Sequence, residues 1–304
     1  MVNEYSINTS RIVPCPPGEG SILVYVNPTE DEKRHLVGDL LIDEHTLNSA
    51  LDPDELSRIE FEPEHLAVIF KKPKNYSTED EFLFKVNSMG LFLFGERLVI
   101  VIPDDIPLFN GKVFNNVNSL NDVLFKILYR TIFHYLDHLK AINLISESLE
   151  QKINTSLENK YLLNLFSLEK SLVYYLNAIN SNAVVIDRLR NHAEKLGLST
   201  ENRELLDDIG IENTQCYRQA EIYSNILASM MDARVSIVSN NLNVLMKTLN
   251  IITIAIMVPT FVVSAFSMNV RIPMADIHNA FYLVMGLALL SVIGFYFFWK
   301  WKKW

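Results

Sequence analysis

Two long runs without a charged side chain lie close together near the carboxy-terminal end of the chain. The first extends from Thr248 to Val270 and the second from Ala280 to Trp299. Each is close to the roughly 20 residues that an α-helix needs to cross a hydrocarbon core about 30 Å thick. Two such runs in tandem are hard to explain as core helices of a protein in water. The sequence therefore predicts two membrane-spanning helices joined by a short turn.

Basic and aromatic residues flank this pair of runs. Lys247 precedes the first run, and the second ends in FYFFWKWKKW, where aromatic residues are followed by three lysines. Aromatic side chains favour the membrane interface, and Lys favours the cytosolic side. We therefore expect a multi-pass protein of the cytoplasmic membrane with both termini in the cytosol. Its expected segments are transmembrane helices over 247–267 and 280–300, an extracytoplasmic loop over 268–279 and a basic cytosolic tail over 301–304.

The composition of the whole chain limits the class of partner. Among 304 residues, 49% are hydrophobic, and 36 acidic side chains outnumber 27 basic ones. A nucleic-acid surface needs clustered Lys and Arg, so this balance favours a cation as partner over a nucleic acid. Cys15 and Cys216 are far apart, which favours neither a disulfide framework nor a zinc ribbon. With no glycine-rich phosphate loop and no GxSxG motif, we expect neither an enzyme nor an organic cofactor.

Short β-branched and aromatic runs dominate the first 115 residues or so. They comprise 21–27, HLAVIFKK and EFLFKVNSMGLFLFGERLVIVIPDD, each broken by Pro, Gly or charge, which is typical of strands. Within the last of these, LFGERLVIV predicts a hairpin. An acid-rich stretch with helix starts, DEHTLNSALDPDELSRIEFEPEH, lies between them. The sequence predicts an amino-terminal cytosolic α/β domain over 1–115, within an α+β membrane protein.

Helical periodicity replaces the β pattern after this domain. Apolar residues recur at spacings of three and four over 120–153 and again over 161–196, where KLGLST predicts a Gly stop and a Thr cap. From Glu201 the pattern continues to Phe266, interrupted only by Gly210 and Pro259. One helix of that length would extend roughly 100 Å. We expect long antiparallel stalk helices over 116–246 that lead into the membrane.

A weakly polar stripe follows one face of the first predicted span. Its members recur at spacings of three and four: Asn243, Met246, Asn250, Thr253, Met257, Thr260, Ser264 and Ser267. One helix cannot enclose a pore, but several copies can, with this stripe turned inward. The alternative is that small hydroxyl residues serve helix packing or bond to their own backbone.

The stripe leads to Asn269, which lies on the predicted turn. An amide carbonyl offers a neutral oxygen to a cation. Because Mg²⁺ surrenders water reluctantly, a ring of neutral amides can order the hydrated ion without trapping it. This arrangement favours the passage of a divalent cation.

The order of the carboxy-terminal motifs resembles that of a known family. SNNLNVLMKTL, MVPTF and FSMN, then a short turn, a second apolar run and KWKKW, resemble the carboxy-terminal third of the CorA family of divalent-cation channels. The upstream domain and stalk follow the same order. The resemblance implies a funnel-shaped homopentamer for uptake of Mg²⁺, and also of Co²⁺ or Ni²⁺. It implies gating by intracellular Mg²⁺ at subunit interfaces, so that Mg²⁺ is both transported and regulatory.

The resemblance also assigns roles to single residues. The family's Gly-Met-Asn motif corresponds to Ser267, Met268 and Asn269, with Asn269 as the outer selectivity ring. Its pore-lining positions map onto Asn243, Met246, Leu249, Met257, Thr260 and Ser264, to which the stripe adds Asn250 and Thr253. Met246, Leu249 and Met257 would form a hydrophobic constriction that closes by dewetting. Regulatory carboxylates map onto Asp207, Asp208 and Asp232, although a solvated acidic helix start also explains the first two.

Two positions depart from the family pattern. Ser267 stands in place of Gly, so its Cβ disfavours backbone angles that glycine permits. Arg271 stands where members often carry an acid, and five arginines at a pore mouth would repel cations over about 8 Å. Two alternatives therefore stay open: a ZntB-like proton-coupled zinc transporter, and a non-conducting membrane-anchored metal sensor or scaffold. His134 and His138, four residues apart, are a weaker candidate zinc site.

Overall fold

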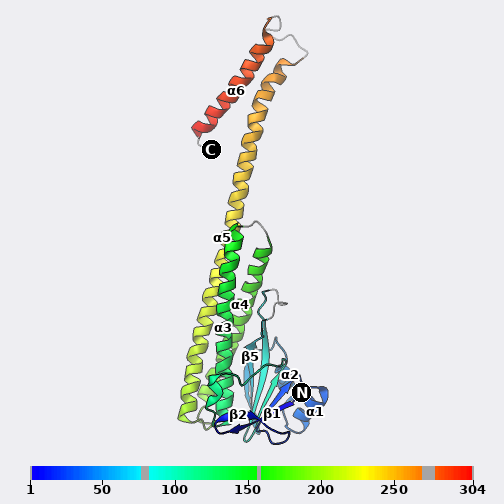
Figure 1. The fold of residues 1–304 in the computed structure, drawn as a ribbon, viewed down its shortest axis with the longest axis vertical. Coiled ribbons are helices and arrows are strands. Elements are labelled where there is room, and N and C mark those ends of the chain that lie inside the picture. The colour runs from blue at the N-terminus through cyan, green and yellow to red at the C-terminus, as the bar shows by residue number, and fades with distance from the viewer. Residues whose placement is uncertain (1, 77–81, 156–158, 269–277, 303–304) are drawn as a thin grey trace. The chain divides into compact units, whose positions relative to one another are not determined.

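The computed structural model describes residues 2–76, 82–155, 159–268 and 278–302. The chain forms two compact units, Met1–Met231 and Asp232–Trp304. Figure 1 shows a β-sheet with helices packed on it and the long helices α3 to α6. Helix α5 (Thr200–Phe266) begins in the first unit and ends in the second.

A mixed seven-stranded sheet forms the centre of the first unit. Its order is β2-β1-β3-β7-β6-β5-β4, and all neighbours are antiparallel except the parallel pair β3 and β7. The strands are β1 (Val2–Asn8), β2 (Arg11–Pro14), β3 (Ile22–Val26), β4 (Arg58–Phe61), β5 (His65–Pro73), β6 (Val86–Phe94) and β7 (Leu98–Ile102). The predicted hairpin is confirmed as β6–β7, with Leu93 opposite Leu98.

Helices cover both faces of the sheet. Alternate residues of a strand point to opposite sides, and the central strands are apolar on both sides, so each face needs a covering layer. On β5, Val68 and Phe70 join the large apolar core shared with α3 (Leu120–Thr155), α4 (Asn159–Asn191) and the start of α5. Ile69 faces the other way, into a smaller core under α1 (Glu30–Gly38) and α2 (Glu44–Ser49). A short 3-10 helix, η2 (Lys112–Asn115), leads into α3. The predicted α/β architecture of the amino-terminal region is confirmed.

Gly90 on β6 has no room for a side chain. A Cβ built there would lie 2.6 Å from the Cβ of Ala50 and 2.8 Å from Cε2 of Phe92. We expect Gly90→Ala to destabilise the fold by about 1–3 kcal/mol, because an overpacked core must shift to accept the methyl group. Thermal unfolding of the detergent-solubilised chain, followed by circular dichroism, measures this. Gly38→Ala is the control, since nothing lies within 4 Å of its Cβ; equal melting temperatures for the two variants would contradict the expectation.

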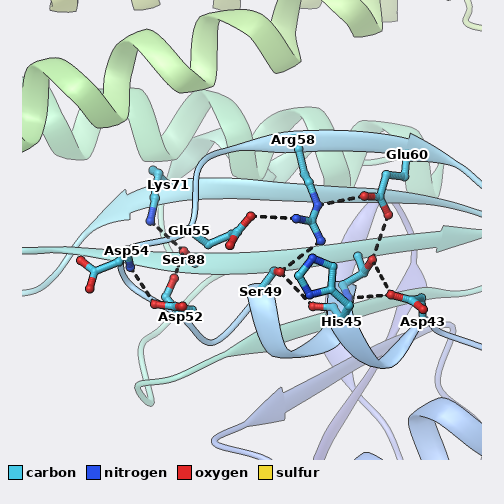
Figure 2. A network of polar contacts seen from close by, with 11 residues as sticks. Asp43, His45, Ser49, Asp52, Asp54, Glu55, Arg58, Glu60, Lys71 and Ser88 are labelled. Atoms are coloured by element: carbon cyan, nitrogen blue, oxygen red, sulfur yellow. Dashed lines mark hydrogen bonds and ion pairs between the residues drawn. The ribbon is translucent and has the colours of Figure 1, made fainter.

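The acid-rich stretch around α2 and β4 is held in a polar network (Figure 2). Arg58 donates from Nη1 to Glu55 at 2.7 Å and pairs through Nε with Glu60 at 2.9 Å. Asp43 caps α2 by accepting a hydrogen bond of 2.9 Å from the backbone N–H of Thr46. These three carboxylates therefore have partners inside the domain.

The long helices match the periodic segments of the sequence, with differences at their ends. Helix α4 ends at Asn191, earlier than the predicted 196, and turns follow it up to Gly197, whose φ is +60°. Ser199, and not the predicted Thr, caps the next helix, because its hydroxyl oxygen accepts a hydrogen bond from the N–H of Asn202. Pro259 lies inside α5 without ending it.

Among the described residues of the second unit, two helical segments are long and apolar enough to cross a membrane. They are the end of α5 and helix α6 (Ala280–Lys302). Large apolar residues are widely exposed on both; for example, Phe261 is 76% and Trp301 80% accessible. Lys300 and Lys302 lie in the last turn of α6. These two apolar helices agree with the two predicted spans.

Candidate functional site

The stripe predicted on the first span lies on a continuous helical segment. Helix α5 is unbroken from Asn243 to Phe266, so residues spaced by three and four share one face. All described members are exposed; Met246 and Met257 are each 63% accessible. Leu249 is also exposed, but it precedes Asn250 and lies about 100° around the helix from it. The stripe is therefore an unpartnered face in the single chain, with Leu249 on its flank.

The two threonine hydroxyl groups of the stripe bond to their own helix. Thr253 Oγ1 donates to the carbonyl of Leu249 at 2.9 Å, and Thr260 Oγ1 donates to that of Ile256 at 2.7 Å. This is the backbone bonding that the alternative interpretation expected. Each hydroxyl has thereby used its only proton, so its oxygen has lone pairs left with which to accept. Such an oxygen can accept hydrogen bonds from the water shell of a cation.

The motif at the end of α5 is described only in part. Ser267 lies in a turn, where both its N–H and its hydroxyl donate to the carbonyl of Ser264, at 3.1 and 2.9 Å. Among the described residues other than glycine, five have a positive φ, and Ser267 is not one of them. The Cβ of Ser267 is thus accepted without backbone strain. Met268 is exposed, whereas Asn269 and Arg271 lie outside the described residues.

The three candidate regulatory carboxylates differ in their surroundings. Asp207 accepts a hydrogen bond of 2.7 Å from Nε of Arg190, on α4, at the edge of a polar cavity of about 530 Å³. Asp208 is exposed and makes no hydrogen bond or ion pair with any residue in the described ranges. Asp232 is also exposed. Throughout the part of the chain that the structure describes, no three His, Cys, Asp or Glu side chains come together as a metal site.

The two histidines of the weaker zinc candidate lie on α3 against the sheet. Their rings are in contact, with centroids 4.5 Å apart. Nδ1 of His138 lies 2.6 Å from the hydroxyl of Tyr175, so one of its ring nitrogens already has a partner. Burial lowers the pKa of both His134 and His138 to about 4. Both rings are neutral at physiological pH, and the described residues supply no third ligand.

These histidines predict a pH dependence of stability. Their folded pKa of about 4 lies below the value of 6.5 expected when unfolded, so the unfolded chain binds more protons between these values. Stability is therefore complete above pH 6.5 and falls as the pH drops towards 4. Melting temperatures measured from pH 7.5 to 4.5 should fall, and less steeply in a His134→Gln, His138→Gln double variant. Parallel curves would contradict this.

Comparisons with known proteins agree on one family. Residues 19–302 match the family model described as CorA-like Mg²⁺ transporter protein. A cobalt/magnesium transport protein CorA from Methanocaldococcus jannaschii is 24% identical over 290 residues, covering 91% of this chain and 89% of the relative. The complete structure of the CorA magnesium transporter from that organism superposes with a TM-score of 0.82 at 21% identity, covering 98% of this chain and 96% of that one.

Two other solved structures share the fold. The full-length CmaX protein has a TM-score of 0.76 at 14% identity, covering 99% of this chain and 97% of its own. The cytoplasmic domain of ZntB from Vibrio parahaemolyticus has a TM-score of 0.61 at 15% identity, covering 78% of this chain and 98% of its own. At such identities the likeness concerns the fold alone.

Proposed function

The chain belongs to the family of CorA-like Mg²⁺ transporter proteins, and on that premise we propose that it carries divalent cations across the cytoplasmic membrane. Mg²⁺ is the proposed main substrate, with Co²⁺ and Ni²⁺ as further ones. The observation that carries the proposal is the exposed stripe on α5, whose threonine oxygens have lone pairs left to accept hydrogen bonds. A single copy cannot enclose a pathway, so the proposal includes a funnel-shaped homopentamer with α5 around the axis and α6 outside it.

The proposed pathway works through water. Mg²⁺ keeps its hydration shell in most protein sites, and neutral oxygens order that shell without holding the ion tightly. In the pentamer, Asn269 supplies a ring of amide oxygens at the outer mouth, and Thr253 and Thr260 accept from hydrating water further in. Met246, Leu249 and Met257 form an apolar constriction that is closed when it loses water. Both termini are placed in the cytosol.

Gating is proposed to use the carboxylates of the stalk. Like charges that face each other across a subunit interface repel, and a divalent ion between them removes that repulsion. Loss of intracellular Mg²⁺ would then loosen the contacts between the five subunits and open the pore. Asp208 is the strongest candidate, because Arg190 already neutralises Asp207 within the chain. Asp232, nearer the membrane span, is the third candidate.

The two adjacent aspartates make a matched pair for testing this sensor. We expect Asp208→Asn to reduce the protection that Mg²⁺ gives the stalk against proteolysis, and to raise the Mg²⁺ concentration needed for half protection about tenfold or more. Asp207→Asn should have a smaller effect, because that carboxylate pairs with Arg190 at 2.7 Å. Limited proteolysis across a Mg²⁺ titration measures both. Unchanged protection in Asp208→Asn would remove it from the sensor.

Flux measurements on reconstituted protein test the function as a whole. Liposomes containing the full chain should take up Mg²⁺ down its gradient, and Co²⁺ and Ni²⁺ in parallel assays. Zinc uptake that follows an imposed proton gradient would instead indicate a ZntB-like transporter. If no divalent cation enters above the level of empty liposomes, the chain is a non-conducting sensor or scaffold and the transport proposal fails.

A further inference from the structure

A small cavity lies in the first unit, between β5, β6 and α3, with residues 106–108 along one side. Its volume is about 140 Å³. This exceeds the space that one water needs and is well below the roughly 300–1,000 Å³ of pockets for drug-sized ligands. The polar side chains that line it are Lys72, Asn75, Arg130, Thr131 and His134. The other lining residues are apolar: Met89, Ile106, Pro107, Leu108 and Ile127. The cavity therefore suits a small ligand that the polar side chains can hold.

Lys72 is a buried cation inside the sheet layer. The residue is 4% exposed, and its side chain makes no hydrogen bond or ion pair within the described ranges. Its neighbour Lys71 points to the other face of β5, where Nζ donates to the carbonyl of Pro53 at 2.6 Å and to Ser88 Oγ at 3.0 Å (Figure 2). Asp104 affects Lys72 only through an electrostatic interaction and makes no hydrogen bond to it. The Nζ of Lys72 is not one of the fully enclosed side-chain atoms that lack a hydrogen-bond partner, so it is open to the cavity that Lys72 lines and can donate to a ligand there.

The remaining polar groups around the cavity also act mainly as donors. Arg130 is exposed at the mouth on α3, and no ion pair engages it in the part of the chain described here. His134, one turn further along α3, is neutral because burial lowers its pKa, and a neutral imidazole donates one N–H. The amide of Asn75 adds two N–H donors. No carboxylate is among the described residues that line the cavity.

We propose that this cavity binds a small tetrahedral oxyanion of the size and charge of phosphate or sulfate. Lys72 holds one oxygen at the floor, and Arg130 binds the outer oxygens through its forked guanidinium, which matches such ions. Asn75 and His134 donate to the remaining lone pairs. A metal cation is disfavoured, because it would be placed between two positive side chains. The proposal is independent of the transport function.

Equilibrium dialysis of the full chain in detergent, with radiolabelled inorganic phosphate in a chloride buffer, tests this site. We expect saturable binding of one phosphate per chain, competed by sulfate but not by acetate. Arg130→Gln and Lys72→Met should each raise the Kd at least tenfold. Lys140→Gln is the matched control: it also removes one cation from α3, but its partner is Asp137 and it does not line the cavity.

The outcomes separate clearly. The proposal is overturned if wild-type protein shows no saturable binding at millimolar phosphate, or if Arg130→Gln binds as tightly as Lys140→Gln. Gel filtration and circular dichroism establish that each variant is folded. If Lys72→Met does not fold, the wild-type and Arg130→Gln measurements still decide the result. Competition by glycerol 3-phosphate as strong as that by phosphate would assign the site to the phosphate group of a larger molecule, and its absence would assign it to the free ion.

Discussion

Replacing Asn269 with Ala is expected to lower Mg²⁺ flux through reconstituted protein at least tenfold. In the proposed pentamer this change removes five amide oxygens from the outer mouth at once. A tenfold loss corresponds to only about 1.4 kcal/mol in ion recognition, less than one typical hydrogen bond to a charged group contributes. Because each copy contributes one amide, removing the whole ring should reach that figure easily. Uptake of Mg²⁺ into liposomes loaded with a magnesium-sensitive dye measures the effect.

A nearby asparagine provides the control for this experiment. Asn279 is exposed just before α6 and lies outside the Ser-Met-Asn motif. Asn279→Ala therefore removes the same chemical group from the same end of the spans and should leave the flux unchanged. Equal fluxes in wild type and both variants, with equal amounts of inserted protein, would exclude Asn269 from the pathway.

A large effect in the opposite direction is expected at Met257. Replacing it with Thr should raise divalent flux about tenfold under high internal Mg²⁺, the condition in which the pore is closed. An apolar constriction closes a pore by excluding water. Five threonine hydroxyl groups at this level would keep water in the constriction. Thr is tolerated at this point of α5, as the hydrogen bonds of Thr253 and Thr260 to the preceding turn indicate.

The adjacent residue separates a pore effect from a general one. Ile256 is as exposed as Met257 in the single chain, at 62% against 63%, but lies about 100° around the helix. Ile256→Thr should leave the closed-state flux at its wild-type level. If both variants leak equally, the added flux reflects weakened helix packing and not a gate. If neither leaks, the constriction lies elsewhere.

The helices were the most predictable part of the fold, and the edge strands the least. A repeat of three and four identifies α3 and α5 almost to the residue, because each carries a continuous apolar face, which α3 buries in the core and α5 buries as far as Leu227. Strands β1 and β2 were not predicted, since VNEYSIN and RIVP are polar enough to resemble loops. Strand β2 is at the edge of the sheet and β1 lies next to it, and in both the inner residues are only half-buried, so the sequence signal is weak.

The candidate sites likewise divide into those that the sequence predicts and those that depend on the packing of the folded chain. Spacing along one helix was enough to predict the stripe, because a regular helix fixes which residues share a face. The pairing of Asp207 with Arg190 could not be predicted, since it depends on how α4 and α5 pack across an intervening turn. The cavity at Lys72 was also missed. Two adjacent lysines in an otherwise apolar strand were an available signal, because the pleat must place one of them on each buried face.

The proline inside α5 restricts what can surround the membrane span. Pro259 has no N–H, so the carbonyl of Ala255, one turn earlier, lacks its usual helical donor. Acyl chains cannot donate a hydrogen bond, and a bare carbonyl in hydrocarbon costs several kcal/mol. That oxygen therefore needs a water molecule or a side chain from a neighbouring helix. At the level of Ala255, the side of α5 opposite the stripe should therefore face protein or solvent and not the hydrocarbon interior of the bilayer.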